Sequence, residues 1–71
     1  MSKPAKVVLD YLMENTPFVV KNSFVSRIVE IDEAYDTIPE DIIDAYEELS
    51  EYELWEIIRK IAVEGKRRNT A

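Results

Sequence analysis

Hydrophobic residues recur every three to four positions along most of this chain, which is the spacing of one face of a helix. Val8 and Leu12 share such a face in a segment that begins near Pro4, a residue suited to a first helical turn. Pro17 ends the segment, because the residue before a proline is disfavoured in the helical region. The pattern therefore predicts a first helix over residues 4–15.

The next apolar positions fit a helix better than a strand. Phe24, Ile28 and Ile31 are spaced i, i+4 and i+7, which again places them on one helical face. A second helix is therefore predicted over residues 23–36. The short β-branched run that precedes it leaves an alternative open, in which residues 18–31 form part of a hairpin.

Two capping boxes mark the starts of two further helices. Thr37 and Glu40 form the first box, and Ser50 and Glu53 form the second. Gly65 is placed to end the last helix, because glycine readily adopts the left-handed conformation that follows many helices. The helices that these signals predict cover residues 38–49 and 51–64.

These elements predict an all-α fold, a compact bundle of three to four short helices in a single domain over residues 1–71. The chain has only one glycine, whereas an all-β domain of this size needs many tight turns. Residues 66–71 are expected to form a frayed basic tail. The predicted core consists of Leu9, Leu12, Phe24, Ile28, Ile31, Ile42, Tyr46, Leu54, Ile58 and Ile61.

The residue types that carry most enzyme and metal chemistry are absent. Cysteine and histidine do not occur, which excludes disulfides, thiolate ligands and histidine-based catalysis. The acidic clusters also lack the glycine that an EF-hand loop needs for its sharp turn. We expect no catalytic residues, no metal site and no cofactor. With no long apolar run and no signal-peptide pattern, we expect a cytoplasmic protein without membrane contact.

Charge is distributed very unevenly along the chain. Residues 28–58 contain twelve acidic side chains and no Lys or Arg, and all nine basic residues lie outside this window. The window therefore has a net charge of −12 in a chain whose total is −6. Such a field governs association with partners more than it governs the fold.

The acidic residues of the third predicted helix fall largely on one side, because positions three and four apart share a face. Carboxylates one turn apart are separated by about 5–6 Å, and a DNA strand shows a phosphate every ~3.4 Å of axis. A row of carboxylates can therefore imitate phosphates and occupy the basic surface of a partner, in particular a nucleic-acid-binding protein. The alternative is a solvated surface that keeps a small protein soluble. The candidate partner-binding acids are Glu40, Asp41, Asp44, Glu47, Glu48 and Glu51.

Two aromatic residues of the fourth predicted helix, Tyr52 and Trp55, lie beside its main apolar face. Tyr and Trp dominate binding hot spots, so we expect this pair to supply the apolar anchor of the same partner site. The alternative for Trp55 is a place in the core. The sequence thus predicts a small non-enzymatic regulatory or inhibitory protein that binds a partner with a basic surface.

Two other functions remain open from the sequence. The first predicted helix has apolar residues beyond its main stripe (Val7, Tyr11 and Met13), so the chain can be a structural homo-oligomer, such as a homodimer, or an accessory subunit. Its basic termini allow a small helical DNA-binding regulator. Direct nucleic-acid binding is disfavoured, because the candidate recognition helices carry acids that repel phosphate.

Two short segments, Asp10-Tyr11-Leu12-Met13 and Tyr35-Asp36-Thr37-Ile38-Pro39, resemble pieces of the small Hha-type nucleoid-modulating proteins. Proteins of that family are helical and have about the same length as this chain. The resemblance covers these two segments alone. No function and no site residue is carried over from it.

Overall fold

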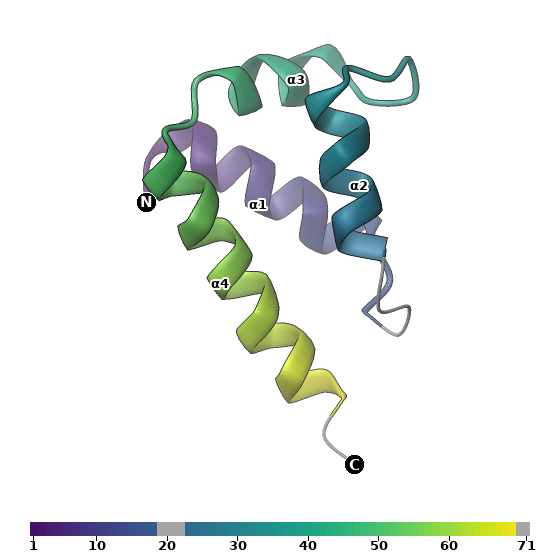
Figure 1. The fold of residues 1–71 in the computed structure, drawn as a ribbon, viewed down its shortest axis with the longest axis vertical. Helices are drawn as coiled ribbons and strands as arrows, with labels where there is room; N and C mark the ends of the chain where they lie inside the picture. Colours follow the sequence, from purple (N-terminus) through teal and green to yellow (C-terminus); the bar gives the residue numbers. More distant parts are fainter. Residues whose placement is uncertain (19–22, 70–71) are drawn as a thin grey trace.

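The structure is a computed structural model that describes residues 1–18 and 23–69. It contains four helices over these ranges and no strand, which confirms the predicted all-α fold (Figure 1). Residues 23–32 are helical, so the helix predicted there is confirmed and the hairpin is not formed by them. Val19 to Asn22 lie outside the described residues. The helices are α1 (Lys3–Asn15), α2 (Ser23–Asp32), α3 (Glu40–Glu47) and α4 (Glu51–Arg68).

The shortest helix, α3, packs on both α1 and α2 at one end of the molecule. It packs across α1 and against the end of α2, while α4 packs on α1 (Figure 1). The longest helix, α4, starts beside the N-terminus and runs beyond the other helices at its C-terminal end. One side of α3 and a long side of α4 are therefore left without a neighbouring helix.

The core is formed by residues of all four helices and by Ile38, which precedes α3. Leu12, Ile31 and Ile42, all predicted core residues, are buried, as is Ile61. The other six predicted core residues are only partly buried. On α4 the core face is centred on Ile57 and Ile61, so Ile57 is fully buried where the sequence favoured Ile58. Among the described residues, the buried apolar set is Ala5, Val8, Leu12, Ile31, Ile38, Ile42, Ala45, Ile57 and Ile61.

The second predicted capping box forms as expected. The Ser50 hydroxyl accepts a hydrogen bond from the Glu53 amide at 3.2 Å, and the Glu53 carboxylate accepts one from the Ser50 amide at 3.0 Å. Glu53 also accepts a hydrogen bond from the Ser2 hydroxyl, and Ser2 is the N-cap of α1. The starts of α1 and α4 are thus joined through one carboxylate, and the Ser2 hydroxyl, followed by the Ser50 amide, lowers the pKa of Glu53.

The first predicted capping box does not form. The N-cap of α3 is Pro39, which provides no side-chain hydrogen bond, and the helix begins at Glu40. Thr37 is exposed in the link before it. The prediction of a Thr37 cap was wrong because Ile38 is buried and the Ile38 amide bonds to the Tyr35 carbonyl at 3.0 Å, which places a turn where the cap was expected.

The second helix ends earlier than the predicted residue 36. Ala34 has a positive φ of 55°, in the left-handed region. The Tyr35 amide bonds to the Glu30 carbonyl at 3.0 Å, and the Ala34 amide bonds to the Ile31 carbonyl at 3.1 Å. This pair of bonds is the Schellman arrangement that ends a helix, with alanine in the position that usually holds glycine. It ends α2 at Asp32.

The fourth helix ends later than predicted. Gly65 lies inside α4, which runs on to Arg68, so the prediction that Gly65 ends the helix was wrong. Residues 66–68 of the expected frayed tail are therefore helical. A Cβ atom on Gly65 would lie 3.4 Å from Cδ1 of Phe18, an ordinary van der Waals contact, so the Phe18 ring packs beside the helix at this position.

Among the described residues, no helix has the length and apolar character needed to cross a membrane.

Candidate functional site

The outward side of α3 is acidic because its inward side is committed to the core. Ile42 and Ala45 are buried against the other helices, and Ile38 is buried just before the helix begins. An α-helix has 3.6 residues per turn, so only part of its surface can face the core and the remaining positions are exposed. Those positions hold the five carboxylates Glu40, Asp41, Asp44, Glu47 and Glu48.

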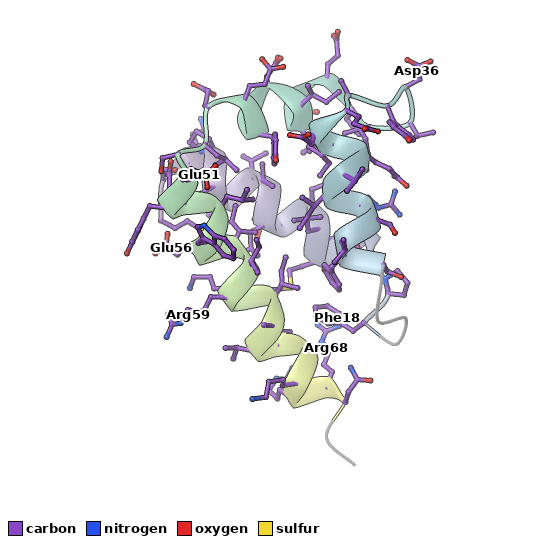
Figure 2. All side chains as sticks on the ribbon, viewed as in Figure 1. Phe18, Asp36, Glu51, Glu56, Arg59 and Arg68 are labelled. Carbon is purple, nitrogen blue, oxygen red and sulfur yellow. The ribbon has the colours of Figure 1, made fainter. Side chains whose placement is uncertain are left out.

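All six acidic residues proposed from the sequence are exposed. We call Glu40, Asp41, Asp44, Glu47, Glu48 and Glu51 the acidic face. Five of them belong to α3 or directly follow it, and Glu51 begins α4 (Figure 2). None of the six forms a salt bridge with another described residue; the four salt bridges of this part of the chain involve other acids. The acidic face is therefore uncompensated within the described protein.

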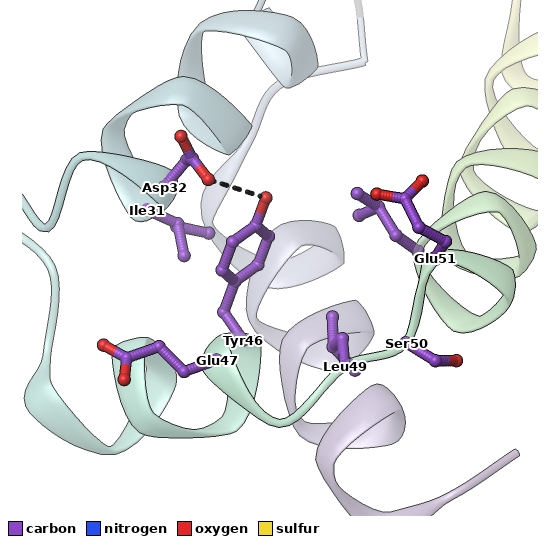
Figure 3. A pocket seen from close by; sticks show the side chains of 8 residues that line it. Ile31, Asp32, Tyr46, Glu47, Leu49, Ser50 and Glu51 are labelled. Atoms are coloured by element: carbon purple, nitrogen blue, oxygen red, sulfur yellow. Dashed lines mark hydrogen bonds between the residues drawn. The ribbon is translucent and has the colours of Figure 1, made fainter.

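One flank of the acidic face borders a polar hollow (Figure 3). Glu47 and Glu51 line it together with Asp32, and the Tyr46 hydroxyl donates a hydrogen bond to Asp32 at 3.2 Å. Burial, and then the negative charge of Asp32, raise the pKa of Tyr46. The Tyr46 hydroxyl is therefore protonated at neutral pH and donates the hydrogen bond that joins α3 to α2.

The other flank of the acidic face borders the start of α1. Asp41, Asp44 and Glu48 are spaced i, i+3 and i+7, and they line a shallow groove whose far side carries Lys3. Lys3 is exposed and forms no salt bridge with a described residue. Although Lys3 lines the same groove, these three carboxylates remain exposed to solvent.

The two aromatic residues of the predicted site lie on α4, facing away from the core. Tyr52 is 76% exposed and Trp55 is 65% exposed, so Trp55 does not complete the core. The sequence did not single out Val63, which is 61% exposed on the same side of α4. Val63 lies eight residues after Trp55, a helical spacing that could have placed both on one face of the helix from the sequence alone.

The basic end of the chain is partly engaged within the protein. Glu64 accepts hydrogen bonds from Arg67 at 2.6 Å and from Arg68 at 2.7 Å. These two guanidinium groups lower the pKa of Glu64 to about 2. Arg68 also lies over the Phe18 ring, 4.3 Å from its centroid. Two of the cations that a nucleic-acid-binding tail would use are therefore held in intramolecular contacts.

The described residues contain no group of three or more acidic side chains arranged to hold a metal ion. The carboxylates of the acidic face are exposed and spread along the outside of a helix. Acid–base catalysis by a carboxylate pair requires a cleft that separates their pKa values.

Comparison with protein-family models, with curated proteins and with solved structures finds no match to this chain.

Proposed function

We propose that this chain is a small non-enzymatic regulatory protein that binds a basic surface of another protein through its acidic face. One observation carries the proposal: six exposed carboxylates on and beside α3 have no salt-bridge partner among the described residues. Like charges at helical spacing destabilise a helix, and a Lys at an i+4 position would relieve that repulsion. A basic partner provides the missing compensation.

The length of α3 supports phosphate mimicry as the form of this binding. The helix has eight residues, which at 1.5 Å per residue span about 12 Å. That length matches about three to four phosphates along one DNA strand. The backbone of α3 is already ordered, so its carboxylates are presented without a cost for backbone ordering, and a nucleic-acid-binding protein offers the matching basic groove. We therefore propose such a protein as the partner.

A capture experiment with paired baits tests this proposal. The tagged chain and a face-neutral variant (Glu40→Gln, Asp44→Asn, Glu47→Gln, Glu48→Gln) are incubated with nuclease-treated lysate of the source cells. Bound proteins are eluted with a salt gradient and identified by mass spectrometry. We expect a basic protein that elutes with salt from the wild-type bait and is missing from the face-neutral bait.

A second variant controls for net charge. The changes Asp10→Asn, Glu14→Gln, Glu33→Gln and Asp36→Asn also remove four exposed carboxylates, but none of them belongs to the acidic face. This control bait should recover the same partner as the wild type. Recovery of the same proteins by all three baits would show that the acidic face only solubilises the chain.

A further inference from the structure

The side of α4 that faces away from the core carries a stripe of exposed apolar surface. Tyr52, Trp55 and Val63 are 76%, 65% and 61% exposed, and Ala62 and Arg59 lie on the same side between them. No other described helix packs on this side, since α4 contacts α1 through its Ile57 and Ile61 face. Large exposed aromatic side chains grouped on one helix mark interaction surfaces.

The charges of α4 divide the helix into two halves of opposite sign. Residues 51–58 contain three acids and no base, whereas residues 59–68 contain five bases and one acid. Glu51 and Glu56 lie in the first half and Arg59 opens the second (Figure 2). Two such helices side by side repel when parallel and attract when antiparallel, because each acidic half then lies beside a basic half.

We propose that α4 pairs with α4 of a second copy in an antiparallel homodimer, with Tyr52, Trp55 and Val63 in the seam. A two-fold interface uses the same patch twice, so the patch must be complementary to itself. The stripe on α4 meets this condition in two respects: apolar residues lie on both sides of Arg59, and the charge of α4 reverses sign near the middle of the helix. The antiparallel order also brings Trp55 near Arg59 of the second copy, where the indole face attracts the guanidinium.

The size of the exposed stripe sets the strength of this dimer. Aromatic side chains bury about 150–250 Å² each, so the exposed parts of Tyr52 and Trp55 offer roughly 300 Å² per copy. Two copies bury about 600 Å² through these rings, and specific interfaces start near ~1,200 Å². Val63, Ala62 and the stems of the charged side chains supply the remainder. The dimer is therefore expected to be weak, with dissociation in the micromolar range.

The proposal is separate from partner binding by the acidic face. The seam lies on α4, and the four residues changed in the face-neutral variant lie on α3 or directly after it, so that variant leaves the seam unaltered. Tyr52, Trp55 and Glu51 are shared, because they were also predicted for the partner site. The face-neutral variant should dimerise like the wild type, because none of its four changes is on α4. A chain that does not dimerise could still bind a partner through its acidic face. A chain that binds no partner through the acidic face could still dimerise.

Trp55 reports on the seam directly, because it is the only tryptophan. The full chain is measured from low micromolar to several hundred micromolar by sedimentation equilibrium and by Trp fluorescence. We expect a concentration-dependent dimer, with emission that shifts to shorter wavelength and resists quenching by acrylamide as the dimer forms. A chain that stays monomeric throughout this range would overturn the proposal.

Substitution at the seam tests where the dimer forms. Trp55→Ala removes an exposed side chain, so the fold should be retained, and dimer affinity should fall at least about tenfold. Val25→Ala is the matched control, because Val25 is 65% exposed on α2, outside the seam. A dimer that Trp55→Ala does not weaken would place the interface elsewhere and overturn the proposal.

Charge reversal tests the antiparallel pairing of opposite halves. Glu51→Lys with Glu56→Lys makes both halves of α4 basic. Arg59→Glu with Lys60→Glu leaves the acidic half unchanged and removes the net positive charge of the other half. Each variant alone should dimerise at least about tenfold more weakly than the wild type. An equimolar mixture should form heterodimers, because the strongly basic second half of the first variant then lies beside the acidic first half of the other variant. A mixture that remains monomeric, or single variants that dimerise normally, would contradict the proposed pairing.

Discussion

Gly65 lies against the ring of Phe18, close enough that a Cβ atom at position 65 would meet Cδ1 of Phe18 at 3.4 Å. The ring also contacts Arg68, and the Phe18 carbonyl accepts a hydrogen bond from the Asn69 side chain at 3.1 Å. Phe18 therefore holds the last turns of α4 to the link that follows α1. The glycine belongs to this contact inside the helix and not to a helix end.

Replacing Gly65 with alanine should stabilise the protein. A distance of 3.4 Å is ordinary van der Waals contact, so the methyl group fits beside Phe18 without displacing it. Alanine is favoured over glycine within a helix by about 0.8–1 kcal/mol. We expect the free energy of unfolding in urea to rise by about 0.5–1 kcal/mol. A fall of similar size would show that position 65 adopts the left-handed conformation of a helix end.

Replacing Ala34 with glycine should also stabilise the protein. The φ of Ala34 is 55°, a conformation that strains a residue with a Cβ atom and that glycine adopts freely. We expect a gain of about 1 kcal/mol in the free energy of unfolding. Ala62→Gly is the matched control: Ala62 is exposed inside α4, so the same substitution there should cost about 1 kcal/mol. Equal effects at the two positions would contradict the left-handed assignment.

The hydroxyl of Thr16 is buried and has no hydrogen-bond partner in the described part of the chain. Valine has nearly the same shape and no polar atom to desolvate. Thr16→Val should therefore raise the free energy of unfolding by about 1 kcal/mol. Thr37→Val, at an exposed position, should change it by less than about 0.5 kcal/mol. Loss of stability on removal of the Thr16 hydroxyl would reveal a hydrogen bond to it.

The pairing of Glu64 with Arg67 and Arg68 should make stability depend on acid pH. The two guanidinium groups lower the pKa of Glu64 from 4.5 to about 2 in the folded protein. A lowered pKa means that the ionised group stabilises the fold above pH 4.5 and that this contribution is lost as the pH falls toward 2. Urea unfolding of the wild type and Glu64→Gln should differ at pH 6 and converge near pH 2.

The titration of Glu64 can also be followed by NMR. In a variant with Arg67→Gln and Arg68→Gln, the pKa of Glu64 should rise toward its ordinary value. An unchanged midpoint in that variant would show that the arginines do not set the pKa.

The sequence predicted those features that depend on local chemistry. The Ser50–Glu53 capping box forms because both partners lie within one turn, so no distant contact decides it. The acids of α3 are exposed because Ile42 and Ala45 leave them no other orientation. This is why the acidic face could be located from residue spacing alone.

The features that were missed depend on contacts between distant residues. Gly65 lies inside a helix whose last turns contact Phe18, and the sequence around position 65 carries no sign of this distant contact. A left-handed Ala34 has no local signature, because glycine is the residue that usually marks such a turn. The exposure of Trp55 follows from the choice of Ile57 over Ile58 as the centre of the α4 core face, which the contact with α1 decides.

The central claim is that the acidic face of α3 binds a basic partner. Its most direct test is the affinity of the recovered partner for three purified proteins, measured by calorimetry at one salt concentration: the wild type, the face-neutral variant and the control variant that also lacks four carboxylates. We predict that the face-neutral variant binds at least about tenfold more weakly and that the control stays within about threefold of the wild type. Equal losses in both variants, or none in either, would contradict the claim.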